Sequence, residues 1–340
     1  MESLKYSMPF LPFLHAVAER RDLSAAEAEQ AMSEILEGET STPQIAAFLV
    51  ALRMKGETAA ELAGFARAMR ARVTRVDAGG GVVLDTCGTG GDGAGTFNVS
   101  TIAALVAAGA GVKVAKHGNR SISSRSGSAD VLEALGVRVQ TAAADMSRAL
   151  HEIGIAFLFA PALHPAMKHA QPARLELKMR TVFNLLGPLA NPAGATAQLI
   201  GAPSEKTAAL MAEAAAQIGG VRGYVVHGEG GLDEVSTIGE TVVFEIGRGS
   251  LRWTPEDFGV GRARLEELRG EDAATNARIA REVLDGRPGP ARDLVLVNAT
   301  AALMAAGVEN AMEAARESID TGAARGKLDQ LVEITNRPLG

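Results

Sequence analysis

The stretch Val82-Val83-Leu84-Asp85-Thr86-Cys87-Gly88-Thr89-Gly90-Gly91-Asp92 places a short apolar segment directly before a glycine-rich turn. After the turn, Asn98-Val99-Ser100-Thr101 leads into an apolar segment with helical spacing, residues 101–110. A strand, a glycine turn and a helix in this order form the first part of a βαβ unit, from which parallel sheets are built. The stretch therefore predicts an α/β fold, with a strand at residues 82–86.

The same alternation of short apolar strands and helices continues along the chain. Further strands are predicted at residues 112–115, 155–159, 197–201, 224–227 and 241–246. Helices are predicted at residues 129–135, 273–284 and 291 to about 335. This order is typical of a mostly parallel central sheet that is covered by helices.

The first 72 residues have a purely helical pattern. Ser24-Ala-Ala-Glu27 and Thr58-Ala-Ala-Glu61 are capping boxes, and Thr42-Pro43 supplies an N-cap followed by proline. Residues 165–178 also read as helix, with no strand to accompany them. We therefore expect the chain to cross the domain boundary more than once. The expected division is a small helical domain of residues 1–72 with about 165–190, and a larger α/β domain of residues 78–164 with about 191–340.

Composition narrows the class of protein. The chain has 340 residues, of which 47% are apolar and 22% charged, as in an ordinary soluble globular protein. Its net charge of −6 argues against nucleic-acid binding, which is driven by basic surfaces. Cys87 is the single cysteine, which excludes an intramolecular disulfide and fits a cytoplasmic location. Residues 8–18 are apolar at helical spacing and carry two prolines, so we interpret them as a helix and not as a secretory signal.

The glycine-rich turn has the properties of an anion-binding loop. Glycines allow close approach to a ligand, and the free N–H groups at the start of the next helix attract negative charge. The spacing matches neither a Walker loop nor the dinucleotide-binding pattern. Asp92 would repel phosphate, but a carboxylate there suits sugar hydroxyls or a metal. The alternative is a simple glycine-rich turn. We expect Cys87 to be a packed residue and not a nucleophile.

A second polar segment follows the strand at 112–115. Lys116-His117-Gly118-Asn119-Arg120 runs into Ser121-Ile122-Ser123-Ser124-Arg125-Ser126-Gly127-Ser128. Cations and hydroxyl donors are thus concentrated at the end of a strand, where open α/β sheets bind ligands. This inventory suits a polyanion such as pyrophosphate. A solvated basic loop is the alternative.

Two further segments leave both a structural and a functional interpretation open. Arg174 could be an ordinary surface arginine, and residues 184–192 read as a structured turn rich in glycine, proline and asparagine. Asp233-Glu234 follows a predicted strand and a glycine turn. Adjacent carboxylates suit Mg²⁺, although such pairs are also common on protein surfaces.

Taken together, these segments closely resemble the anthranilate phosphoribosyltransferase family over nearly the whole chain, most specifically in residues 116–120 and 123–135. The resemblance implies a nucleoside phosphorylase/phosphoribosyltransferase-like fold, a homodimer formed through the helical domain, and transfer of a phosphoribosyl group from phosphoribosyl pyrophosphate (PRPP) to anthranilate with Mg²⁺ in tryptophan biosynthesis. An anthranilate synthase partner is left open. No membrane or nucleic-acid partner is expected.

The resemblance also implies roles for individual residues. The positions that match PRPP-binding residues are Gly88, Gly91, Asp92, Thr96, Asn98, Val99, Ser100, Thr101, Lys116, His117, Gly118, Asn119, Arg120, Ser121, Ile122, Ser123, Ser124 and Ser128. The positions that match Mg²⁺ ligands are Ser100, Asp233 and Glu234, and those near anthranilate are Gly88, His117, Asn119 and Arg174. No covalent nucleophile is expected, and Lys116 and Arg174 would give electrostatic support.

One departure from the family pattern stands out. Glu176-Leu177-Lys178-Met179 occupies a place where the family pattern has Glu-Leu-Gly-Ile, so a lysine replaces a glycine. This could alter a hinge or the substrate channel without changing the chemistry. Two other functions remain possible: a nucleoside phosphorylase of similar architecture, which the Lys-His-Gly-Asn run fits poorly, and a nucleic-acid-binding relative, which the net charge disfavours.

Overall fold

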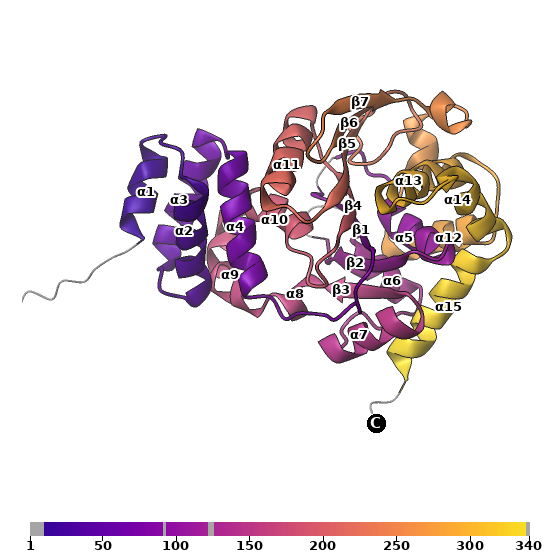
Figure 1. Cartoon of the computed structure of the whole chain (residues 1–340), viewed down its shortest axis with the longest axis horizontal. Coiled ribbons are helices and arrows are strands. Elements are labelled where there is room, and N and C mark those ends of the chain that lie inside the picture. The colour runs from indigo at the N-terminus through magenta and orange to yellow at the C-terminus, as the bar shows by residue number, and fades with distance from the viewer. Residues whose placement is uncertain (1–9, 91–92, 122–125, 338–340) are drawn as a thin grey trace, which may run out of the picture. The chain divides into compact units, whose positions relative to one another are not determined.

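The computed structural model describes residues 10–90, 93–121 and 126–337. The chain forms two compact units, and each is made from two separate stretches of sequence (Figure 1). One unit comprises Met1–Val73 and His164–Ala190, and the other comprises Thr74–Leu163 and Asn191–Gly340. Within the part of the chain that is described, no helix is both long and apolar enough to cross a membrane.

The first unit is helical. Its helices are α1 (Leu11–Ala18), α2 (Ala25–Glu37), α3 (Thr42–Lys55), α4 (Ala59–Ala71), α9 (Gln171–Leu177) and α10 (Phe183–Leu189). The core is apolar: Phe48 is fully buried and makes edge-to-face contacts with Phe10 and Phe65 at ring-centroid distances of 5.2 and 6.1 Å. Helices α2 and α4 cross closely at Gly64, where a Cβ atom would lie 2.2 Å from the Ala25 carbonyl oxygen.

The helix caps follow local sequence chemistry. The Ser24 and Thr58 hydroxyls accept hydrogen bonds from the Glu27 and Glu61 N–H groups, so both predicted capping boxes are confirmed. The predicted N-cap at Thr42 is wrong by one residue. Ser41 caps α3, and its N–H donates to Gln44 Oε1 at 3.1 Å.

The second unit is built on one sheet. The described residues form seven strands in the order β3-β2-β1-β4-β5-β6-β7. Their bounds are β1 (Val83–Gly88), β2 (Lys113–Gly118), β3 (Ile155–Phe159), β4 (Ala197–Gly201), β5 (Arg222–Gly228), β6 (Thr241–Glu245) and β7 (Ser250–Trp253). Neighbouring strands from β3 to β5 are parallel, whereas β6 and β7 are antiparallel additions at one edge. The predicted α/β class with a mostly parallel sheet is confirmed.

Helices cover this sheet (Figure 1). They are α5 (Val99–Gly109), α6 (Ser128–Ala134), α7 (Ala143–Glu152), α8 (Ala160–Leu163), α11 (Glu205–Ile218), α12 (Ala273–Leu284), α13 (Pro290–Ala306), α14 (Ala311–Asp320) and α15 (Ala323–Asn336). Buried helix α5 packs against β1 and β2, and α13 packs against β1, β4 and β5. Their nearly continuous apolar surfaces fit burial between the sheet and outer helices.

Several predicted elements differ in the structure. The single helix predicted from 291 to about 335 is three helices in the structure. Gly307 has a left-handed conformation and ends α13, and Gly322 has a left-handed conformation directly before α15. The helix predicted at 165–178 is a 3₁₀ turn, Pro165–His169, followed by α9, which begins next to Pro172. Much of the turn predicted at 184–192 is helix α10.

Candidate active site

The polar segments converge at the carboxyl ends of the parallel strands. Strand β1 lies between β2 and β4, so the chain leaves β1 toward one side of the sheet and later returns on the other. Such a reversal in strand order opens a crevice where α/β sheets bind ligands. Gly88 ends β1, Gly118 ends β2 and Gly201 ends β4. Asp233 and Glu234 lie in the loop after β5.

The glycine loop after β1 is tied to the acidic pair. The Thr89 N–H donates to the Gly201 carbonyl at 2.9 Å, and the Gly90 N–H donates to Asp233 Oδ2 at 3.2 Å. Gly88 also packs against the Asp233 carboxylate, because a Cβ atom on Gly88 would lie 2.6 Å from Asp233 Oδ2. The predicted residues Gly91 and Asp92 lie outside the described residues.

The start of α5 is tied to the same pair. The Ser100 N–H, in the first turn of the helix, donates to Glu234 Oε1 at 3.2 Å. The Thr86 hydroxyl donates to the Ser100 carbonyl at 2.8 Å, which links α5 to β1. Val99 and Thr101 are buried beside Ser100. The structure therefore brings the three predicted metal-binding residues to one place, although more than 130 residues separate Ser100 from Glu234.

The chemistry of these groups suits a hard cation. Asp233 and Glu234 are half-buried carboxylates, and Ser100 adds a hydroxyl oxygen. The residues that the structure describes contain no cluster of three or more His, Cys, Asp or Glu side chains that could hold a metal alone. Mg²⁺ characteristically binds to one or two carboxylates and completes its shell with water and substrate phosphate. The donor set thus fits Mg²⁺ bound together with a phosphorylated substrate.

Lys116 is a buried cation between β1 and α5. Its side chain is 4% exposed, and its Nζ donates to the Thr86 carbonyl at 2.5 Å and to Ser100 Oγ at 3.3 Å. Burial lowers the pKa of Lys116, while the negative charges of Asp85 and Glu234 act in the opposite direction. A buried cation beside the acidic pair can attract a polyanion strongly, because few water molecules screen it.

Strand β1 also carries a buried polar side chain, Asp85, to which the sequence motifs assign no role. Asp85 is fully buried in β1, where its Oδ1 accepts the His117 N–H at 3.0 Å. Its Oδ2 accepts Asn191 Nδ2 at 2.8 Å, and the same nitrogen donates to the Ala115 carbonyl at 2.9 Å. Asp85 therefore fixes the end of β2 relative to β1. A carboxylate inside an otherwise apolar strand was the signal that could have found it.

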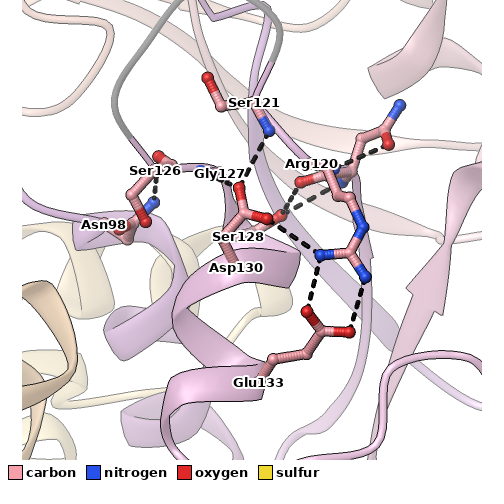
Figure 2. Close-up of polar contacts among 9 residues, drawn as sticks. Asn98, Arg120, Ser121, Ser126, Gly127, Ser128, Asp130 and Glu133 are labelled. Atoms are coloured by element: carbon pink, nitrogen blue, oxygen red, sulfur yellow. Dashed lines mark hydrogen bonds and ion pairs between the residues drawn. The ribbon is translucent and has the colours of Figure 1, made fainter. Parts of the chain in front are cut away.

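Asp130 bonds to the described residues on both sides of the serine-rich turn, which we define as residues 119–128 (Figure 2). Asp130 Oδ2 accepts the Gly127 and Ser121 N–H groups at 2.8 and 3.1 Å. Desolvation raises the pKa of Asp130, but these bonds and the Arg120 guanidinium outweigh it and leave the pKa lowered. Arg120 also forms a two-point ion pair with Glu133, with both distances 2.6 Å. Arg120 is therefore already paired with the carboxylates of Asp130 and Glu133.

The remaining predicted residues of this turn are only partly described. The Asn119 N–H donates to Ser128 Oγ at 3.2 Å, and Ser128 packs so closely on Gly118 that a Cβ there would lie 2.3 Å from its hydroxyl. Ile122, Ser123 and Ser124, together with Arg125, lie outside the described residues.

The predicted anthranilate contact Arg174 belongs to the helical unit. It lies on α9, and its guanidinium carbon is 5.1 Å from the centroid of the Phe183 ring. Burial lowers the pKa of Arg174. The aromatic face attracts the guanidinium cation, and a guanidinium can bind a planar carboxylate at two points.

Comparison with known proteins identifies the family. Residues 80–325 match the α/β domain of a glycosyl transferase family, and residues 11–73 match its helical bundle domain. Anthranilate phosphoribosyltransferase from Solibacter usitatus is 57% identical over 336 residues, which cover 96% of this chain and 99% of the relative. The chain belongs to the anthranilate phosphoribosyltransferase family.

Solved structures of anthranilate phosphoribosyltransferases share the fold. The Thermus thermophilus enzyme superposes with a TM-score of 0.91 at 45% identity and covers 95% of this chain and 99% of its own. The Saccharomyces cerevisiae enzyme in complex with PRPP and Mg superposes with a TM-score of 0.90 at 31% identity, covering 98% and 99%. The same yeast enzyme in complex with 4-fluoroanthranilate gives 0.87 at 30% identity, covering 98% and 100%. The family resemblance expected from the sequence is confirmed.

Proposed function

We propose that this protein transfers the phosphoribosyl group of PRPP to the amino group of anthranilate, with release of pyrophosphate, in tryptophan biosynthesis. The observation that carries the proposal is the convergence of a glycine loop, a helix start, Lys116 and the Asp233-Glu234 pair at the carboxyl ends of β1, β2 and β4. The full-length similarity to anthranilate phosphoribosyltransferases supports the same reaction.

The proposed site residues divide by chemistry. Those assigned to PRPP are the glycine loop (Gly88, Gly91, Asp92, Thr96), the α5 start (Asn98, Val99, Ser100, Thr101), the end of β2 with the residues that follow it (Lys116 to Ser124), and Ser128 at the start of α6. Asp233 and Glu234, with Ser100, would hold Mg²⁺, which supplies positive charge to the pyrophosphate oxygens when bound. Gly88, His117, Asn119 and Arg174 would bind anthranilate.

The chemistry requires charge stabilisation more than a nucleophile. The bond between the anomeric carbon and the pyrophosphate oxygen breaks while the anthranilate nitrogen bonds to that carbon, and the nitrogen then loses a proton. Lys116 would stabilise the negative charge that grows on the leaving group, and Arg174 would hold the anthranilate carboxylate. Burial raises the pKa of Cys87 well above its usual range, so its thiol is unsuited to nucleophilic attack.

A homodimer formed through the helical unit is part of the proposal. Met54 on α3 and Leu175 on α9 are 70% and 61% exposed, and apolar side chains with that exposure suit a protein contact. Light scattering of the purified protein should give twice the mass of one chain, and a Met54→Glu/Leu175→Glu variant should give the mass of one chain.

Anthranilate fluorescence tests the reaction directly. We expect the signal of anthranilate to fall only when the protein, PRPP and Mg²⁺ are all present, and pyrophosphate to appear in equal amount. Inosine with inorganic phosphate serves as the counterpart substrate pair. Phosphorolysis of the nucleoside without loss of anthranilate would favour a nucleoside phosphorylase, and salt-sensitive binding of single-stranded DNA without either reaction would favour the nucleic-acid alternative.

A further inference from the structure

Asn98 is oriented by Asn276, a buried asparagine 178 residues later in the chain. Asn276 lies in the first turn of α12, is 3% exposed, and donates from Nδ2 to Asn98 Oδ1 at 2.9 Å. Its own Oδ1 accepts the Glu271 N–H at 2.9 Å. Because a backbone N–H can only donate, this bond fixes which end of the Asn276 amide faces Asn98.

The orientation passes on to Asn98. Since its oxygen accepts from Asn276, its nitrogen faces the other way and donates to the Ser126 carbonyl at 3.2 Å (Figure 2). Asn98 is also the N-cap of α5, two residues before Ser100. The same amide therefore connects the end of the glycine loop to the end of the serine-rich turn, and both are in the proposed PRPP site.

The backbone near Asn276 runs along the glycine loop. The Gly270 N–H donates to the Gly95 carbonyl at 2.9 Å, and Thr96 pairs with Arg269 in an antiparallel bridge. Gly270 has no room for a side chain, because a Cβ atom would lie 2.6 Å from Phe97 Cα and 2.7 Å from Asn276 Oδ1. We name residues 268–276 the clamp segment.

We propose that Asn276, supported by the clamp segment, is a positioning residue for the PRPP site that acts through Asn98. The inference rests on the proposed function. Asn276 is not needed to start α12, because Asp272 caps that helix by accepting the Thr275 N–H at 2.8 Å. Its side chain instead joins α12 to a loop 178 residues earlier. It sets the direction of the Asn98 N–H group that donates to the Ser126 carbonyl.

A double-mutant cycle tests the dependence on Asn98. Asn276→Ala should raise the KM for PRPP several-fold to about tenfold, the effect of losing one buried hydrogen bond, and leave the KM for anthranilate unchanged. Asn98→Ala/Asn276→Ala should be no worse than Asn98→Ala alone. Asn336→Ala is the control, because that exposed amide also joins segments 200 residues apart but lies on α15. Additive effects of the two substitutions would overturn the proposal.

A conservative variant separates positioning from support of the fold. Asn276→Asp keeps an oxygen for the Glu271 N–H but turns a second oxygen toward Asn98 Oδ1, so it should impair PRPP binding at least as much as Asn276→Ala. If Asn276 only supported the fold by accepting the Glu271 N–H, Asn276→Asp would behave like the wild type. That result would contradict the proposal.

Hydrogen exchange tests the clamp without any substrate. In Asn276→Ala, backbone amides at residues 95–98 should exchange faster, whereas those of β4 and β5 should be unchanged. If exchange at residues 95–98 is unchanged in Asn276→Ala, the proposal that Asn276 holds this loop is wrong, even if the enzyme is active. If the wild-type protein neither binds PRPP nor consumes anthranilate, the proposed function fails, and the exchange result still decides whether Asn276 holds this loop.

Discussion

The carbonyl oxygen of Asp233 occupies the space where a side chain on Gly201 would begin. A Cβ atom at Gly201 would lie 1.6 Å from that oxygen, and one at Gly88 would lie 2.6 Å from Asp233 Oδ2. Strands β1 and β4 both end in glycine, and the acidic loop packs directly against these ends. Because both glycines lack a side chain, the Asp233 carboxylate can reach the glycine loop.

Gly201→Ala should displace Asp233. Overpacking at a buried position costs about 1–3 kcal/mol, so we expect a lower free energy of unfolding in urea and a loss of most transferase activity. Gly261→Ala is the control, because a Cβ there meets no atom within 4 Å. An active, fully stable Gly201→Ala protein would mean that the acidic loop can move away without consequence.

Removing the charge of the acidic pair should raise the Mg²⁺ requirement. In Asp233→Asn and Glu234→Gln the amide oxygen can still accept the Gly90 or Ser100 N–H, so the fold is retained while the charge is lost. We expect the Mg²⁺ concentration for half-maximal activity to rise about tenfold or more in each variant. Glu240→Gln, at an exposed pair with Arg252, should leave it unchanged. If the Mg²⁺ concentration for half-maximal activity is the same in all variants, Asp233 and Glu234 do not bind the metal.

Activity should fall at alkaline pH as Lys116 loses its proton. Because burial lowers the pKa of Lys116 from 10.5, the fall in kcat/KM for PRPP should have its midpoint below pH 10.5. Asp85 favours the charged ammonium, so Asp85→Asn should move the midpoint to a still lower pH. Rate profiles of the two proteins, with stability checked at each pH, measure the difference. Identical midpoints would show that the Asp85 charge does not act on Lys116.

Much of the fold could be predicted because it is encoded locally. The strands at 155–159 and 197–201 and the helix at 273–284 have the predicted bounds, since apolar runs and caps mark their ends. Strand β7, with three exposed residues, was missed because it shows no apolar alternation. Helix α11 was also missed, although its buried residues Ala208, Met211, Ala212 and Ala215 have helical spacing. The helix breaks that follow residues 306 and 320 occur near Gly307 and Gly322, and the apolar pattern continues across both glycines without an interruption that would predict a break.

The site was predictable only where its residues lie in sequence motifs. Lys116, Ser100 and the acidic pair stand beside strand ends, and the structure brings them together. Asp85 stands out in the sequence as a polar residue in an apolar strand. Its hydrogen-bond partner Asn191 could not be recognised, because it is 106 residues away along the chain. Asn276 gave no local signal at all, since its function depends on a contact that only folding creates.

Arg174→Lys should selectively weaken anthranilate binding. The guanidinium lies over Phe183 and can bind a carboxylate at two points, whereas an ammonium group has no planar fork for two-point binding. We expect the KM for anthranilate to rise about tenfold and the KM for PRPP to stay constant. Arg67→Lys, at a partly exposed pair with Glu29, is the control in the same unit. A rise in the KM for PRPP alone would assign Arg174 to the other substrate.

Lys178→Gly should stabilise the helical unit. Lys178 has φ +46° and ψ +35°, the left-handed conformation that a side chain disfavours. Our sequence-based expectation for this family is a glycine at this position. Relief of this strain is worth about 1–2 kcal/mol, and the greater freedom of glycine in the unfolded chain offsets about half of it. The expected gain is therefore about 0.5–1 kcal/mol in urea unfolding. Lys168→Gly is the control and should be destabilising, because Lys168 lies in a 3₁₀ turn and has no positive φ. A loss of stability in Lys178→Gly would show that the lysine side chain stabilises the helical unit by more than its backbone strain costs.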